Sequence, residues 1–194
     1  MSLCTTTYAK TLADIARVDT TRLQALLDAA TDMIESYCDR TFAAADYTNY
    51  IDGNDQRWIY VHNAPINSIT SVVIKGTDDL TETIAGTEFR YDSTIGKIEF
   101  KPSATSSYGY FPKGFENIQI NYNGGWATIP AAVQEACALA ARNLYARSGG
   151  GTNPAYTDEK MGEHTYKRQS ANTEIITPDI AVLLAKYCRT LIVG

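Results

Sequence analysis

The sequence predicts an α+β fold in which a small helical core carries an inserted antiparallel β subdomain. Three observations lead to this prediction. Apolar residues recur at helical spacing near both ends of the chain, short alternating strand patterns lie between them, and 14 of the 20 aromatic residues fall between Phe42 and Trp126. Since no single amphipathic helix can bury its own apolar face, the helices before and after the β region must pair in space. The expected parts are residues 1–44, 45–126 and 127–194.

The clearest helix is expected from Thr21 to Cys38, where Thr21 and Gln24 have the spacing of a capping box. Its apolar residues step by three and four along one face. They are Leu23, Leu26, Leu27, Ala30, Met33, Ile34, Tyr37 and Cys38. A shorter helix is expected over Thr11–Arg17, with Leu12, Ile15 and Ala16 facing inward.

The middle of the chain contains short runs of strand character bounded by turn residues. Strands are expected over residues 57–61, 71–75, 97–101 and 117–122. Asp52-Gly53 and Asn123-Gly124 are expected to supply the positive φ angles of tight turns. Ala64-Pro65 and Phe111-Pro112 are expected to mark edges or corners of the sheet.

The last third returns to helical periodicity. Pro130 suits the first turn of an alanine-rich helix that runs to Arg147. Residues 149–172 have little apolar content, which predicts a long irregular loop with an extended strand over Met161–Tyr166. Thr177-Pro178 then opens a final helix, whose inward residues are expected to be Ile180, Leu183, Leu184 and Tyr187.

Composition excludes several classes of protein. The chain has 194 residues, 44% of them hydrophobic, which is enough for a packed core. The formal net charge of −5 argues against a protein that grips DNA by neutralising phosphates. No apolar run approaches a membrane span, and the N-terminal residues do not read as a secretory signal. The four cysteines lie far apart without a CxxC pair, so a zinc site is not expected. The cysteines are instead expected to be buried free thiols of a protein in a reducing cytoplasm.

No pattern in the sequence indicates catalysis. Phosphate-binding, dinucleotide-binding, nucleophile-elbow and zinc-protease motifs are absent. Glu163-His164 is the one acid next to a histidine, and it is interpreted as solvated. Asp52–Asp55 is interpreted as a hairpin turn and not as a calcium loop. A hydrolase whose carboxylates meet only in space stays open as an alternative.

The order of several short motifs resembles the head–tail connector (adaptor) proteins of tailed bacteriophages and prophages. Within the first long helix the matching residues are Ala30, Ile34, Glu35, Tyr37 and Arg40. The further matches are Pro65–Val72, Tyr91 with Gly96–Ile98, Ile120–Ala136, the run EKMGEHTY at 159–166 and the tail from Ile176 to Tyr187. The resemblance covers roughly Tyr8 to Leu191.

The resemblance implies a connector-type helix bundle and a structural protein that is not an enzyme and needs no cofactor. Copies would form a homo-oligomeric ring beneath the portal protein after the genome is packaged, at the head–tail junction of the virion. The ring would extend the DNA conduit and dock the next tail or stopper protein, with DNA only as passing cargo and no membrane partner. During assembly the protein would lie in the cytoplasm of the bacterial host.

Three groups of candidate site residues follow. The candidate partner or oligomer interface comprises Tyr156, Lys160, Met161, His164, Tyr166, Lys167 and Arg168. Gly149, Gly150 and Gly151 form a candidate hinge, since they stop the preceding helix. Tyr108, Tyr110 and Phe111 lie in a Ser/Gly/Pro loop and are candidate exposed contacts. The alternative function is a β-rich glycan- or peptide-binding module without catalysis, in which exposed aromatics would stack on the ligand.

Overall fold

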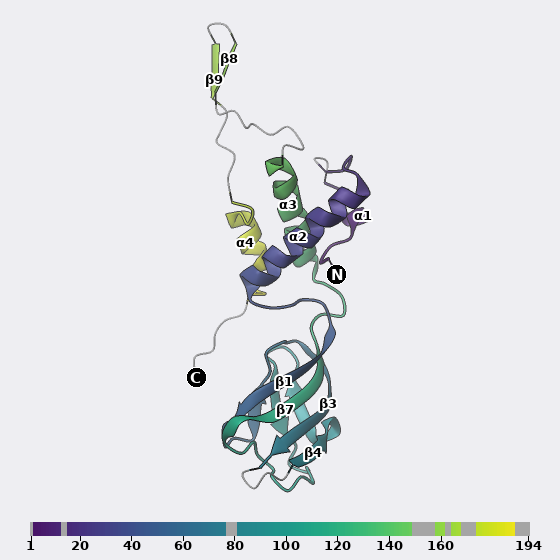
Figure 1. Ribbon diagram of the computed structural model, residues 1–194, viewed down its shortest axis with the longest axis vertical. Coiled ribbons are helices and arrows are strands. Elements are labelled where there is room, and N and C mark those ends of the chain that lie inside the picture. Colours follow the sequence, from purple (N-terminus) through teal and green to yellow (C-terminus); the bar gives the residue numbers. More distant parts are fainter. Residues whose placement is uncertain are drawn as a thin grey trace. The chain divides into compact units, whose positions relative to one another are not determined.

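The computed structural model describes residues 2–12, 15–76, 81–148, 158–161, 164–167 and 174–188. Its helices are α1 (Thr6–Ala9), α2 (Thr20–Cys38), the 3-10 turn η1 (Gly86–Glu88), α3 (Ala131–Arg147) and α4 (Pro178–Leu184). Its strands are β1 (Ala45–Gly53), β2 (Trp58–Tyr60), β3 (Ile66–Lys75), β4 (Thr81–Ala85), β5 (Phe89–Asp92), β6 (Lys97–Phe100), β7 (Gly114–Gly124), β8 (Asp158–Met161) and β9 (His164–Lys167). The predicted α+β class is confirmed (Figure 1).

The chain divides into two compact units. The helical unit consists of Met1–Arg40 together with Ile129–Gly194, and the sheet unit consists of Thr41–Thr128. The sheet unit is therefore continuous in sequence, whereas the helical unit is assembled from two separate stretches of chain.

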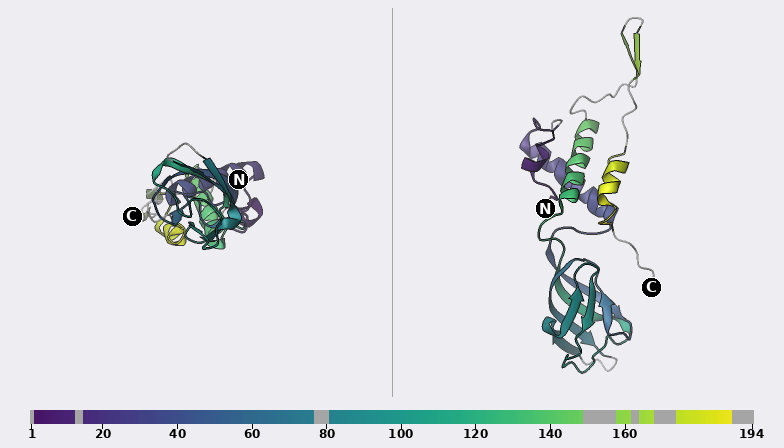
Figure 2. Two further views of the ribbon diagram at one scale, coloured as in Figure 1. Left: turned by 90° about the horizontal axis from the view of Figure 1, so that it is seen from below. Right: turned by 180° about the vertical axis from the view of Figure 1, so that it is seen from behind.

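In the helical unit, α3 packs against both α2 and α4 (Figure 1, Figure 2). The buried residues of α2 are Leu23, Leu27, Ala30, Thr31, Ile34 and Cys38. Those of α3 are Val133, Ala136, Cys137, Ala138, Ala140 and Ala141. Because alanine is small, the α3 backbone can approach its neighbours closely. Thr31 satisfies its buried hydroxyl by donating to the Leu27 carbonyl at 2.8 Å and accepting from the Leu3 amide at 3.0 Å.

The N-terminal end of α2 differs from the expected capping box. Asp19 is the N-cap, and its carboxylate accepts from the amides of Thr21 at 2.9 Å and Arg22 at 3.3 Å. An aspartate caps as well as a threonine and also interacts favourably with the helix dipole. Tyr37, expected on the buried face, is half exposed.

The helix expected over Thr11–Arg17 is wrong. The first helix is instead α1, whose N-cap Thr5 accepts from the Tyr8 amide at 3.1 Å. Thr11 donates its hydroxyl to the Tyr8 carbonyl at 2.7 Å, and the described residues that follow form turns. Ile15 is buried as expected, but Ala16 is exposed.

The sheet unit contains two antiparallel sheets. The first has the strand order β1-β7-β3-β4 and the second has the order β2-β6-β5. Residues from both sheets contribute to one apolar core, so the sheets share it as two layers. An aromatic cluster lies within this core, with the Phe100 ring centroid 4.7 Å from that of Phe89 and 4.9 Å from that of Phe111.

Strand positions agree with the alternation in the sequence, but two glycines do not have the expected role. Gly53 and Gly124 are the last residues of β1 and β7 and lie outside the positive-φ set. Both are required by close approach instead, because a Cβ atom would collide with the carbonyl of Pro112 or of Asn63 respectively. Positive φ angles occur instead at other glycines, among them Gly96 in the turn before β6 and Gly125 directly after β7.

The two ends of the sheet unit are joined to each other by a clasp, defined here as Phe42, Ala43, Ala44 and Trp126. The rings of Phe42 and Trp126 stack with their centroids 5.2 Å apart. The Trp126 amide donates to the Phe42 carbonyl at 2.8 Å, and the Ala44 amide donates to the Trp126 carbonyl at 3.2 Å. The chain therefore enters and leaves the sheet unit at one point.

Replacement of Phe42 by alanine tests the clasp. Phe42 is fully buried, so we expect F42A to lower the free energy of unfolding of the sheet unit by about 3–5 kcal/mol. Urea denaturation followed by tryptophan fluorescence measures it, because both tryptophans belong to the sheet unit. F115A is the matched control, since Phe115 is 82% exposed and its loss should change stability by less than about 0.5 kcal/mol. Equal midpoints for F42A and F115A would contradict the assignment.

Candidate interaction surfaces

The predicted C-terminal interface residues lie partly in a hairpin. Strands β8 and β9 pair antiparallel, with Met161 opposite His164 and Asp158 opposite Lys167 in the backbone register. A single strand over Met161–Tyr166 is therefore wrong, because the chain reverses within that range. Lys160 belongs to β8 and Tyr166 to β9. Tyr156, Arg168 and the candidate hinge at residues 149–151 lie outside the described residues.

The loop predicted to be an exposed contact is exposed only in part. Tyr110 has 42% of its surface accessible and meets Tyr108 edge to face, with the ring centroids 6.5 Å apart. Phe111 contradicts the prediction, because its side chain is fully buried in the aromatic cluster. The backbone fixes it there, since Phe111 exchanges amide–carbonyl hydrogen bonds of 2.8 Å with Asp55 and Gln56.

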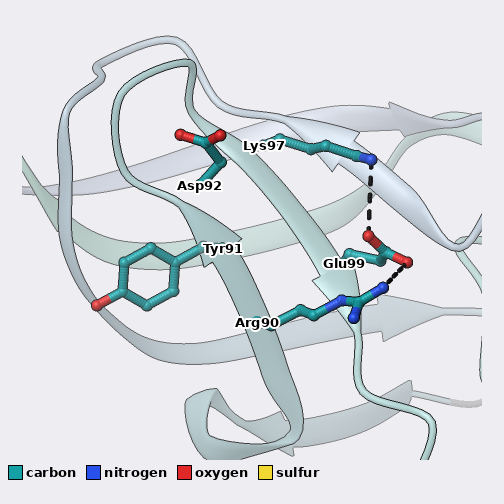
Figure 3. Close-up of a pocket in the computed structure, with 5 residues that line it drawn as sticks. All are labelled: Arg90, Tyr91, Asp92, Lys97 and Glu99. Atoms are coloured by element: carbon teal, nitrogen blue, oxygen red, sulfur yellow. Dashed lines mark hydrogen bonds and ion pairs between the residues drawn. The ribbon is translucent and has the colours of Figure 1, made fainter.

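The outer face of the three-stranded sheet carries a charged row beside two aromatic rings. Arg90 on β5 and Lys97 on β6 approach the carboxylate of Glu99 at 2.6 and 3.6 Å (Figure 3). The Lys97 ammonium also lies 5.4 Å from the ring centroid of Trp58, which meets Tyr60 edge to face. Figure 3 shows Tyr91 on the other side of β5, pointing away from Glu99.

A pocket lies beside this charged row, and both carboxylates that line it have hydrogen-bond partners. Its volume is about 290 Å³, and it is lined by Arg90, Tyr91, Asp92, Lys97 and Glu99. The hydrogen bond from Arg90 lowers the pKa of Glu99, which keeps that carboxylate ionised and paired. Asp92 accepts from the amides of Thr94 and Ile95 and so organises the turn before β6. Both carboxylates therefore have partners within the hairpin, Glu99 in the ion pairs and Asp92 in the turn.

The outer face of the four-stranded sheet is a polar network that is almost without charge. Asn121 accepts from the Thr48 hydroxyl at 2.8 Å and donates to Ser71 at 3.0 Å, which links β1, β7 and β3. One row along, Asn67 donates to Asn123 at 2.9 Å and Asn123 donates to Asp46 at 2.7 Å. The cross-strand amides are satisfied by one another and by neighbouring hydroxyl and carboxylate groups, so this face is polar and hydrogen-bonded across strands.

Several exposed aromatics were not predicted from the sequence, and Phe115 is the most exposed of those that the structure describes. Phe115 is 82% exposed at the start of β7, next to Glu116, which has a positive φ of 46°. The Glu116 amide donates to the Asp52 carboxylate at 2.7 Å, and the Gly53 amide donates to Asn117 at 2.9 Å. These bonds hold the irregular backbone that turns Phe115 outward. The only signal in the sequence is the break of strand alternation at Lys113-Gly114.

The buried hydroxyl of Tyr122 on β7 links the segment between β2 and β3 to strand β1. The Asn63 amide donates to the Tyr122 oxygen at 3.1 Å, and this hydroxyl in turn donates to Asn49 on β1 at 2.5 Å. Burial raises the pKa of Tyr122 to about 12. The neutral phenol is therefore the form that the fold requires.

The described cysteines are free thiols, three of them buried, and the described residues offer neither a metal-binding cluster nor a membrane-spanning helix. Burial raises the pKa of Cys4 and of Cys38 to about 12 and that of Cys137 to about 11, as expected for cysteines that pack as small apolar residues. Within the part of the chain that the structure describes, no cluster of three or more His, Cys, Asp or Glu residues could hold a metal ion. None of the described helices is long and apolar enough to cross a membrane.

Comparison with known proteins gives one family and a set of similar folds. A family model described as head completion protein matches residues 2–167. A chain from the neck of an empty gene transfer agent particle, computed with C6 symmetry, superposes with a TM-score of 0.57 at 14% identity, covering 92% of this chain and 83% of the other. A chain from the virion of a native gene transfer agent particle gives a TM-score of 0.55 at 13% identity, with 91% and 81% covered. A chain from the neck of the native particle, computed with C12 symmetry, gives a TM-score of 0.51 at 14% identity, with 89% and 84% covered. No curated protein matches the chain.

The pH dependence of stability tests the role of Tyr122. Its pKa is about 12 in the folded chain and about 10 in the unfolded chain, so the folded state keeps a proton that the unfolded state loses between these values. We expect the wild-type stability to fall above pH 10 by up to about 1.4 kcal/mol per pH unit from this group.

The Y122F variant separates this contribution from the others. It should be less stable than the wild type by about 1–3 kcal/mol at pH 8, because Asn63 and Asn49 lose their partner. Above pH 10 its stability should decline less steeply than that of the wild type. Urea denaturation from pH 8 to 11.5 measures both, and parallel curves above pH 10 would refute the assignment.

Proposed function

The chain belongs to the head completion protein family, and from this premise we propose that it is a structural component of the junction between the head and the tail of a tailed phage, prophage or related particle. Copies form a ring beneath the portal protein, extend the conduit for DNA and present a docking surface to the next tail or stopper protein. The observation that carries the proposal is the family match over residues 2–167.

The ring is supported by symmetry. The similar chains come from particle necks that were computed with C6 and C12 symmetry. A head-to-tail contact between identical copies closes into such a ring when its rotation fits the number of copies. One patch on the chain must then meet a different patch on the next copy, so two separate exposed surfaces are needed.

The sheet unit offers surfaces suited to such contacts. The exposed aromatics Tyr50, Phe115 and Tyr110 lie on it, with 59%, 82% and 42% of their surfaces accessible. Aromatic side chains are enriched at interface centres because they bury a large area with little loss of conformational entropy. The polar network of the four-stranded sheet, linked through Asn121 and Asn123, would supply a hydrogen-bonding face in the same unit.

A non-catalytic role fits the chemistry of the site. The carboxylates in the pocket of Figure 3 are committed to Arg90, Lys97 and the β5–β6 turn. The weakly acidic chain suits a conduit wall, because a surface with a large excess of lysine and arginine would hold the DNA that has to slide past it.

The second part of the proposal assigns portal attachment to residues 156–170. This segment contains the candidate interface residues Tyr156, Lys160, Met161, His164, Tyr166, Lys167 and Arg168. It belongs to the least acidic third of the chain, since residues 127–194 carry seven lysines and arginines against six acids. An acidic surface on the portal would complement it.

Binding to the portal protein of the same genome tests both parts. We expect the full chain to attach to isolated portal rings in several copies, visible by electron microscopy, and deletion of residues 156–170 to weaken attachment at least tenfold. I95A, which alters an exposed side chain of the turn before β6 that belongs to none of the proposed contact surfaces, is the matched control. Full attachment by the deletion variant would overturn the assignment of the segment, and failure of the full chain to attach would overturn the junction role.

A further inference from the structure

We propose that Cys38 and Cys188 form an oxidisable pair, in which a disulfide joins the end of α2 to the turn that follows α4. Nothing in the proposed function requires this site. It is a covalent modification site of the helical unit, and it stands or falls independently of portal attachment.

The geometry brings two distant cysteines into direct contact. The sulfur atoms of Cys38 and Cys188 lie 3.1 Å apart, although 150 positions separate the residues in sequence. Cys38 is the last residue of α2 and is 1% exposed, whereas Cys188 is half buried. A disulfide needs a sulfur–sulfur distance of about 2.05 Å, so closing the bond requires a movement of only about 1 Å.

Neighbouring hydrogen bonds hold the two cysteines next to each other. Arg40, just beyond α2, donates from its guanidinium to the Tyr187 carbonyl at 2.9 Å. The Cys188 amide donates to the carbonyl of Leu184 at 3.0 Å, and the Leu184 side chain is fully buried. The position of Cys188 opposite Cys38 is thus fixed by contacts of the segment that precedes it, and it does not depend on the thiol contact alone.

The other two cysteines provide an internal contrast. Cys137 directs its thiol to the Leu27 carbonyl at 3.8 Å, and Cys4 donates to the carbonyl of Thr5 at 3.3 Å. Both are buried and both have oxygen acceptors. They are accordingly expected to stay reduced under conditions in which Cys38 and Cys188 react.

The reaction is a thiol–disulfide exchange with a low-molecular-weight disulfide such as glutathione disulfide. Cys188, the more accessible thiol, loses its proton and attacks one glutathione sulfur, which breaks that S–S bond and releases one glutathione thiolate. Cys38 then loses its proton and attacks the Cys188 sulfur, which releases the second. Two protein thiols are oxidised, glutathione disulfide is reduced to two thiols, and the two protons end on the glutathione released.

The environment of Cys38 controls when the bond forms. Burial raises the pKa of the Cys38 thiol to about 12, so the second step is slow at neutral pH and faster as the pH rises. A reducing cytoplasm would keep both thiols free, and an oxidising exterior would favour the disulfide. The bond would close a loop from Cys38 to Cys188 that contains the whole sheet unit and α3.

Intact-mass measurement on the full chain tests the proposal. The reduced protein, with its four thiols, is incubated with glutathione disulfide at pH 8 and then analysed by mass spectrometry and peptide mapping. We expect the mass to fall by about 2 Da, with one crosslinked peptide pair joining Cys38 to Cys188. The midpoint of thermal unfolding of the helical unit, followed by circular dichroism, should rise by about 5–15 °C on oxidation and return after reduction.

Matched variants sharpen the result. C188S should show neither the mass loss nor the thermal shift, while the double variant C4S/C137S should show both. C38S should stop at a glutathione adduct on Cys188, since no second thiol resolves it. A wild-type chain that keeps four thiols, that accumulates the same adduct, or that crosslinks another pair of cysteines would overturn the proposal.

Discussion

The clasp between Phe42 and Trp126 is the contact on which the organisation of this chain depends. It closes the sheet unit at the point where the backbone enters and leaves, through stacked rings and two backbone hydrogen bonds. With its ends joined, the unit can be inserted between α2 and α3 in sequence while those two helices still pack against each other. The helical unit can then bury the apolar face of α2 against α3, which neither helix could do alone.

The chemistry of the described residues is that of a scaffold. Carboxylates are used to cap α2, to shape turns and to pair with Arg90, and the buried hydroxyls of Thr31 and Tyr122 have partners. What remains available at the surface is shape and hydrogen-bonding pattern, together with a few exposed aromatic rings. Those are the properties by which one protein recognises another, and they agree with membership of a family of head completion proteins.

Periodicity in the sequence was enough to predict the fold class, the strands β2, β3, β6 and β7, and the helices α2, α3 and α4. It failed where long-range contacts decide. Asp19 and Thr21 are both good caps, Gly53 and Gly124 follow residues typical of turns, and Phe111 lies in a loop that an aromatic core draws inward. For the surfaces, the exposure of Phe115 leaves only a break of strand alternation at Lys113-Gly114. The meeting of Cys38 with Cys188 leaves no local signal, because the two residues lie far apart in sequence. The side chains at residues 156–168 stay a prediction.

The interruption of the helical unit by the sheet unit has a consequence for synthesis on the ribosome. Translation adds about 5–20 residues per second, so the segment of about 90 residues between α2 and α3 takes on the order of 4–18 s to emerge. All strands of both sheets in that segment exist before the first residue of α3 does. The β structure can therefore form first, while the apolar face of α2 stays exposed because α3 has not yet been synthesised. Order along the chain thus favours folding of the inserted unit before the unit that contains it.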